Sequence, residues 1–124
     1  REVVRVKQLE NVLDLFYNKG GFEFTLNYLI GKSEMTPFDF YTELSDYYYI
    51  KGYQHRSHSK EDLYRILYGY AMWKCRHSGV DREEAIRYLE QDMKLRLNED
   101  AVRKFMKKGW EFPQEKRWQE NIRI

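Results

Sequence analysis

The chain has 124 residues, of which 34% are charged, 17% are aromatic and two are prolines, which excludes a disordered chain and fits one globular domain. The 22 basic and 20 acidic side chains leave a formal charge of +2. The charge therefore lacks the basic excess that is typical of nucleic-acid binders, and we do not expect nucleic acid as the main partner.

The single cysteine and the hydropathy pattern exclude further classes. One cysteine, Cys75, rules out an internal disulfide and any metal or iron–sulfur site that needs several thiolates. Its apolar neighbours predict a small buried side chain. No apolar run reaches the ~20 residues of a membrane span, and no signal peptide is visible, so we expect a cytoplasmic protein without membrane contact. Because the chain opens at Arg1 without a methionine, we expect a segment of a longer protein.

The first two helices are expected over residues 2–18 and 22–30. The apolar face of the first consists of Val6, Leu9, Val12, Leu13, Phe16 and Tyr17. The residues between the helices, Asn18-Lys19-Gly20-Gly21, form a stop signal, because Gly and Asn tolerate the left-handed conformation. Residues 31–33 are expected to end the second helix.

A third helix is expected over residues 36–50. Thr36 can cap its free amides, Pro37 suits the first helical position, and Gly52 closes it. Its polar arc carries three carboxylates: Asp39, Glu43 and Asp46. Such spacing admits a catalytic carboxylate pair, but a solvated or partner-facing edge is the commoner arrangement.

The helix expected over residues 59–77 is the most apolar in the chain. Its apolar side chains cover more than half of the circumference, so neighbours must wrap it on two or three sides. Ser59 is expected to cap it, and Gly79 is expected to end it in the left-handed conformation. We expect it to form an antiparallel hairpin with the third helix.

The fifth helix is expected from Asp81 to about Leu97, with Asp81 and Glu84 forming a capping box. A short sixth helix follows Asn98 and ends at Gly109. The pattern contains no convincing strand. The sequence therefore predicts an all-α fold, a compact bundle of about five to six helices around the central helix 59–77. Residues 1–113 form one domain, and 114–124 form a polar tail whose order the sequence leaves open.

Two groups of side chains deserve separate interpretation. His55 and His58 have a spacing that can hold a metal, but zinc needs further protein ligands, so we expect solvated loop histidines. Eleven tyrosines exceed the needs of a core, and we expect some of them to face a partner. No motif of a catalytic, cofactor or metal site is present, and none is expected in this chain. The candidates for an interaction face are Gly20, Gly21, Phe22, Tyr48, Tyr49, His55 and His58.

Three stretches follow one another in an order that resembles a known family. They read NKGGF (residues 18–22, leading to Thr-Leu at 25–26), TPFDFY (residues 36–41) and SHS (residues 57–59, leading to Leu-Tyr at 63–64). These resemble segments of the C-terminal helical domain, itself of unknown function, of cobalamin-binding radical S-adenosylmethionine proteins. Members are often labelled Fe–S oxidoreductases or anaerobic magnesium-protoporphyrin IX monomethyl ester cyclase-like. Lys19 and Gly21 stand where that family tends to have serine and arginine.

The resemblance implies an accessory domain whose partner is the catalytic barrel upstream in the same polypeptide. It also implies a 4Fe–4S cluster, S-adenosylmethionine and cobalamin in that parent protein, none of them bound by this chain. The Gly20-Gly21 turn or the tyrosine-bearing hairpin would then face the barrel or its substrate. The alternative is a free-standing helical module that binds a protein or RNA through tyrosines and C-terminal lysines. Whether this chain by itself is an enzyme stays open.

Overall fold

The computed structural model describes residues 2–112, and within that range it contains six α-helices and no strand, which confirms the predicted all-α fold. The predicted tail 114–124 lies outside the described residues. The elements are α1 (Glu2–Val12), the π-helix η1 (Leu13–Asn18), α2 (Glu23–Ser33), α3 (Pro37–Ile50), the 3-10 helix η2 (Tyr53–His55), α4 (Lys60–Cys75), α5 (Arg82–Arg96) and α6 (Glu99–Lys108).

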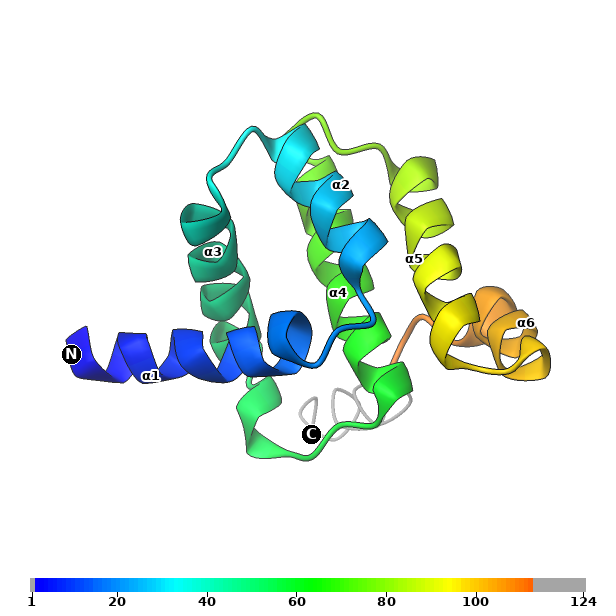
Figure 1. Ribbon diagram of the computed structural model, residues 1–124, viewed down its shortest axis with the longest axis horizontal. Helices are drawn as coiled ribbons and strands as arrows, with labels where there is room; N and C mark the ends of the chain where they lie inside the picture. The colour runs from blue at the N-terminus through cyan, green and yellow to red at the C-terminus, as the bar shows by residue number, and fades with distance from the viewer. Residues whose placement is uncertain (1, 113–124) are drawn as a thin grey trace, which may run out of the picture.

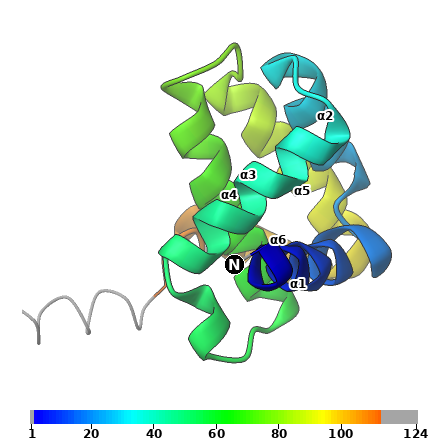
Figure 2. The ribbon, with the colours of Figure 1, turned by 90° about the vertical axis from the view of Figure 1, so that its left-hand side faces the viewer.

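Helices α2, α3, α4 and α5 stand side by side, and α1 crosses one end of this group (Figure 1). Helix α2 packs against α5, α4 packs against both α3 and α5, α1 packs against α3, and α6 packs against α5. The first turns of α1 project past α3, and Figure 2 shows this helix nearly end-on with its N-terminus toward the viewer. The side chains of residues 3–7, in these turns, are exposed among the described residues.

The core is centred on α4, as the sequence predicts. Five of its side chains are at most 1% exposed: Tyr64, Ile66, Leu67, Tyr70 and Ala71. The helix ends at Cys75, which is half-buried rather than fully buried as expected. The expected left-handed stop at Gly79 is wrong, because Gly79 does not have positive φ. The hydroxyl of Ser78 instead donates to the Lys74 carbonyl at 2.8 Å and so satisfies a terminal acceptor.

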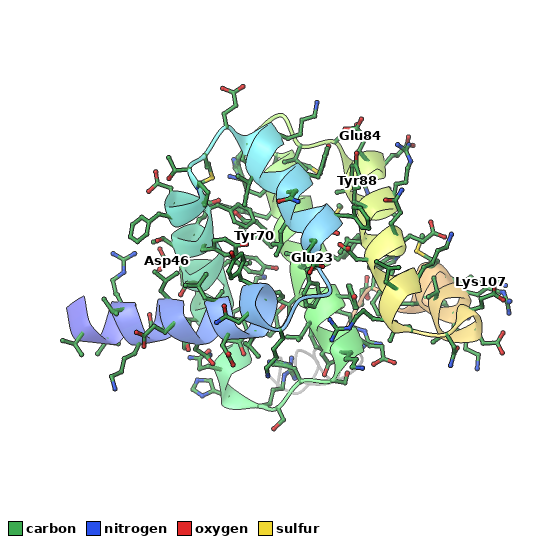
Figure 3. The ribbon with its side chains drawn as sticks, viewed as in Figure 1. Glu23, Asp46, Tyr70, Glu84, Tyr88 and Lys107 are labelled. Atoms are coloured by element: carbon green, nitrogen blue, oxygen red, sulfur yellow. The ribbon has the colours of Figure 1, made fainter. Side chains whose placement is uncertain are left out.

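The predicted N-caps of four helices are confirmed. Thr36, Ser59, Asp81 and Asn98 each accept a hydrogen bond from the backbone amide three residues later, at 2.7–3.1 Å. At Asp81 the reciprocal bond of the capping box is replaced, because the Glu84 carboxylate accepts from the hydroxyl of Tyr28 on α2 at 2.7 Å. The ring of Tyr28 also stacks on Tyr88, 4.9 Å between centroids, so Glu84 and Tyr88 together join α5 to α2 (Figure 3).

Helix α2 is longer than expected. It continues through Gly31 to Ser33, and the chain turns only at Glu34, which has φ +56°. A glycine in a helix interior is tolerated at a cost of about 1 kcal/mol relative to alanine, so Gly31 does not by itself end the helix. The correction moves the turn but leaves the apolar side of α2 in place, with Leu26 and Leu29 buried.

Candidate functional site

The first helix changes its winding at its C-terminal end. The sequence pattern predicts one α-helix over residues 2–18, whereas residues 13–18 form the π-helix η1. A π-turn carries one more residue per hydrogen-bonded ring than an α-turn, so the apolar face shifts around the axis. Phe16 is buried, but Tyr17 is 63% exposed instead of facing the core. π-helical turns are rare in proteins, but those that occur are often found at functional sites. The residues around this end of the helix are therefore candidates for a functional site.

The chain leaves η1 through two consecutive glycines with positive φ, Gly20 at +73° and Gly21 at +99°, as the sequence predicts. A side chain at Gly21 would collide with the guanidinium of Arg96. Three groups hold the turn. The Arg96 guanidinium donates to the Gly20 carbonyl at 2.6 Å, the Tyr64 hydroxyl donates to the Gly21 carbonyl at 2.7 Å, and Glu23 accepts from the Gly21 amide at 3.0 Å. The turn is therefore held rigidly by side chains from α2, α4 and α5.

The start of α2 is capped from another helix. Asp92 on α5 is 0% exposed, and its carboxylate accepts from the amides of Phe24 and Thr25 at 3.2 and 2.9 Å. It also accepts from the Thr25 hydroxyl at 2.7 Å. Burial raises the pKa of Asp92 above its ordinary value, and these three hydrogen bonds oppose that effect. Since Asp92 occupies the amides that could attract an anion, this helix terminus is closed to an external anion.

A pocket of about 400 Å³ opens beside the π-helix, between η1, α2 and α3. Seven residues line it: Phe16, Tyr17, Asn18, Glu23, Leu26, Asn27 and Tyr41. Phe16 and Leu26 are nearly fully buried and provide an apolar floor. The other five residues surround it with two aromatic rings, two amides and a carboxylate. Polar and apolar side chains contribute to the lining in similar measure, and the volume lies in the usual range of ligand sites.

The aromatic pair of this pocket comes from two helices. The rings of Tyr17 and Tyr41 meet edge to face, with centroids 5.8 Å apart. Burial, with a smaller contribution from Tyr17, raises the pKa of Tyr41 to about 12. Tyr41 therefore keeps its proton at neutral pH and is not a general base there. Tyr41 therefore contributes an aromatic ring to the lining of the pocket and not a base.

The interaction-face candidates divide into buried and accessible side chains. Gly20 and Gly21 are partly exposed, while Phe22 is 3% exposed and packs against Phe16 and Tyr64. Near the C-terminal end of α3, Tyr48 is 3% exposed. Tyr49 is half-buried, and its hydroxyl accepts from the side-chain amide of Asn11 at 2.8 Å. The structure thus places residues 20–22 beside Tyr64 of α4, whereas Tyr48 and Tyr49 lie near the C-terminal end of α3.

The two loop histidines differ from each other. His55 is exposed, as expected, but the expectation of a solvated side chain is wrong for His58, whose side chain is 4% exposed. Its Nε2 atom lies 2.7 Å from the Tyr53 carbonyl, and its ring packs against Phe112. Its Nδ1 atom lies 3.8 Å from Asp62. Within residues 3–112, no three His, Cys, Asp or Glu side chains are grouped to hold a metal.

The carboxylates of α3 also divide. Asp39 is exposed, and Asp46 forms an exposed ion pair with Arg5 at 3.1 Å. Glu43 instead accepts hydrogen bonds from the Lys74 ammonium at 2.8 Å and from the Tyr70 hydroxyl at 2.7 Å. Figure 3 shows Tyr70 between α3 and α4. The expected solvated edge therefore holds for two of the three carboxylates, and Glu43 serves as the counter-charge of a buried lysine.

Comparison with known proteins gives one result. A family model described as "Protein of unknown function (DUF4080)" matches residues 1–123. No curated protein and no solved structure matches the chain. In the part of the chain that the structure describes, no helix combines the length and the apolar character of a membrane span.

Proposed function

The chain belongs to the DUF4080 family, and on that premise we propose that it is a non-catalytic accessory domain of a longer enzyme. The enzyme would be a cobalamin-dependent radical S-adenosylmethionine protein, of the Fe–S oxidoreductase or magnesium-protoporphyrin monomethyl ester cyclase-like type. The domain packs on the catalytic barrel of that protein. The three sequence stretches at residues 18–22, 36–41 and 57–59 support the choice of parent. The exposed face of α1 supports the docking.

The observation that carries this proposal is a row of apolar side chains on the projecting turns of α1. Val3, Val4 and Val6 are 67%, 55% and 52% exposed. Isolated exposed apolar residues are normal, but Val3 and Val6 are three positions apart and share one face of the helix, with Val4 next to Val3, and exposed apolar patches mark interaction sites. These residues belong to the first turns of α1, which project past α3 (Figure 1). A neighbouring domain of the same polypeptide would cover them.

The side chains of this chain that could ligate a metal fit an accessory role rather than a cofactor site. A 4Fe–4S cluster needs several thiolates, and the chain supplies one cysteine, half-buried at the end of α4. No position here takes over a cluster or cobalamin ligand. The cluster, S-adenosylmethionine and cobalamin belong, in this proposal, to the upstream part of the parent protein.

The native reading frame tests the choice of parent directly. We expect the codons upstream of Arg1 to encode a barrel domain with a CxxxCxxC motif. A frame that begins close to Arg1, or an upstream region without that motif, would overturn the proposal.

The docking face is tested with the separate domains. We expect the upstream region, expressed alone, to retain the 124-residue chain on an affinity column. The double variant Val3→Asp/Val6→Asp should weaken this binding at least tenfold, because a desolvated charge disfavours an apolar interface. Leu95→Asp, at a 72% exposed position on α5, is the matched control and should bind as the wild type does. Equal binding by the wild type and the double variant would remove α1 from the interface.

A free-standing interaction module is the second candidate, and α6 favours it. Its outer side carries four exposed cations: Arg103, Lys104, Lys107 and Lys108. Lys107 lies at the far end of the molecule from the N-terminus of α1 (Figure 3). An RNA-binding form of this module predicts an affinity for RNA that falls steeply with salt concentration. Absence of RNA binding at low salt would eliminate that form.

A further inference from the structure

We propose that the pocket between η1, α2 and α3 binds an organic cation, a guanidinium or ammonium group. The source is either a free small molecule or an arginine or lysine side chain of a partner. This inference does not depend on the accessory-domain proposal, because the residues that form the pocket belong to this chain and their chemistry is the same in either context. It rests on the residues that line the pocket, on the charges around it and on the capping of α2.

The walls of the pocket fit a cation. Tyr17 and Tyr41 present two rings in an edge-to-face pair with centroids 5.8 Å apart. A cation within about 6 Å of a tyrosine ring is attracted by the negative potential of the ring face, and the attraction increases where water is excluded. Tyr41 is 7% exposed and Tyr17 is 63% exposed, so one ring forms the inner wall and the other lies at the opening.

The polar groups of the pocket are mainly acceptors. Glu23 contributes a carboxylate, and its Oε1 atom accepts from the Gly21 amide while Oε2 lies on the side of Gly20. Asn18 and Asn27 contribute side-chain carbonyls, and neither amide has a hydrogen-bond partner among the described residues. A guanidinium group has five N–H donors in one plane and an ammonium has three, so both match several acceptors around one opening.

The charged groups near the pocket decide whether the Glu23 carboxylate can bind a cation. Lys19 lies 4.0 Å from Asp14, and the guanidinium of Arg96 binds the Gly20 carbonyl. Among the described residues neither cation forms an ion pair with Glu23, although Arg96 keeps its positive charge at the same turn, because a carbonyl does not neutralise it. The anion-attracting amides at the start of α2 are occupied by Asp92. Glu23 is therefore the charged residue in the lining of the pocket, and its carboxylate favours a positively charged ligand over a negatively charged one.

The experiment compares two probes of the same shape. Butylguanidine is a cation at neutral pH, whereas butylurea is its neutral counterpart. We expect saturable binding of butylguanidine to the 124-residue chain, measured by NMR chemical-shift perturbation that includes the Tyr17 and Tyr41 ring protons. Butylurea should bind at least tenfold more weakly. Equal affinities for the two probes, or no saturation with butylguanidine, would overturn the proposal without any variant being needed.

Variants then locate the site. Glu23→Gln keeps an oxygen that accepts from the Gly21 amide but removes the charge, so the turn persists and butylguanidine affinity should fall about tenfold. Tyr17→Leu should reduce it about threefold or more. The matched controls are Glu83→Gln, in the exposed first turn of α5, and Phe38→Leu, at a 68% exposed aromatic on α3. Wild-type affinity in both pocket variants would place the bound cation elsewhere and contradict the proposal.

Peptides distinguish the two sources of the cation. An acetylated and amidated Ala-Arg-Ala peptide and its citrulline counterpart are titrated in the same way. Tighter binding of the arginine peptide than of butylguanidine would identify a partner side chain as the occupant. Tighter binding of butylguanidine would identify a free small molecule. If neither cation binds better than its neutral counterpart, the pocket does not select for charge.

Discussion

Asp92 on α5 caps a helix to which it does not belong, with its Oδ2 atom 2.9 Å from the amide and 2.7 Å from the hydroxyl of Thr25 on α2. The carboxylate also accepts from the Phe24 amide, and its side chain is fully buried. Next to it, Arg96 and Tyr64 hold the carbonyls of Gly20 and Gly21. Side chains of α4 and α5 therefore hold the glycine turn, which joins the pocket-lining residues Asn18 and Glu23.

Removal of this cap should destabilise the fold strongly. Asp92→Ala leaves two amides and a hydroxyl without their acceptor in a buried site, and we expect the free energy of unfolding to fall by ~2–4 kcal/mol. Urea denaturation followed by circular dichroism measures it. The control is Asp100→Ala, whose carboxylate is 77% exposed and bound only to a surface arginine, and it should lose less than ~1 kcal/mol. A similar loss in both variants would show that the buried Asp92 cap contributes no more to the free energy of unfolding than an exposed carboxylate.

The buried ion pair of α3, Glu43 with Lys74, should contribute more to stability than its exposed pair, Asp46 with Arg5. Glu43→Gln keeps an acceptor for the Tyr70 hydroxyl but leaves the ammonium of Lys74, whose side chain is 7% exposed, without its counter-charge. We expect a loss of ~1–3 kcal/mol in the free energy of unfolding. Asp46→Asn breaks an exposed pair with Arg5 and should cost ~1 kcal/mol or less. Equal urea midpoints for the two variants would contradict this assignment.

The features that could be predicted from sequence are those whose partners lie close along the chain. The caps at Thr36, Ser59, Asp81 and Asn98 bind an amide three residues away, so residue type and spacing suffice to find them. The glycine turn follows from conformational freedom alone. The central position of α4 follows from the width of its apolar face.

The features that could not be predicted depend on distant partners. Asp92 meets Thr25 across 67 positions and Lys74 meets Glu43 across 31, and no local pattern connects them. A signal was nevertheless present, because each charge interrupts an apolar face: Asp92 falls three positions after Leu89, and Lys74 falls four after Tyr70. The π-helix has no such signal, since residues 13–18 continue the pattern of an ordinary α-helix. The pocket depends on that π-helix, so its two tyrosines could not be placed together from the sequence.

Replacement of Gly21 or Gly31 by alanine should change the stability of the fold in opposite directions. Gly21→Ala forces a side chain into φ +99° and into the guanidinium of Arg96, and we expect a loss of ~1–3 kcal/mol in the free energy of unfolding. Gly31→Ala adds a methyl group inside α2, where no atom other than those of the adjoining helix lies within 4 Å, and should gain ~0.5–1 kcal/mol. Thermal unfolding midpoints should move in opposite directions. A rise for Gly21→Ala would show that the turn does not need its left-handed conformation.

The raised pKa values of Tyr41, which is buried, and of Tyr28, which is half-buried, predict a loss of stability at alkaline pH. Burial raises the pKa of Tyr41 to about 12, and burial together with the hydrogen bond to Glu84 raises the pKa of Tyr28 to about 12, whereas a tyrosine in the unfolded chain ionises near pH ~10. Between these values the unfolded chain releases protons that the native protein retains, so rising pH favours unfolding. The stabilisation is complete below pH ~10 and is lost as the pH rises through about 12.

Tyr41→Phe isolates one of these groups. The Tyr41 hydroxyl has no hydrogen-bond partner among the described residues, so at pH 7 we expect this variant to match the wild type within ~0.5 kcal/mol. Above pH ~10 its free energy of unfolding should fall less steeply, by at most ~1.4 kcal/mol per pH unit for the one tyrosine removed. Urea titrations at intervals from pH 9 to 12 measure the slope, and Phe38→Leu should keep that of the wild type. If Tyr41→Phe and the wild type decline in parallel, Tyr41 already ionises in the native protein near the pH of an exposed tyrosine, and the inner wall of the pocket is open to water.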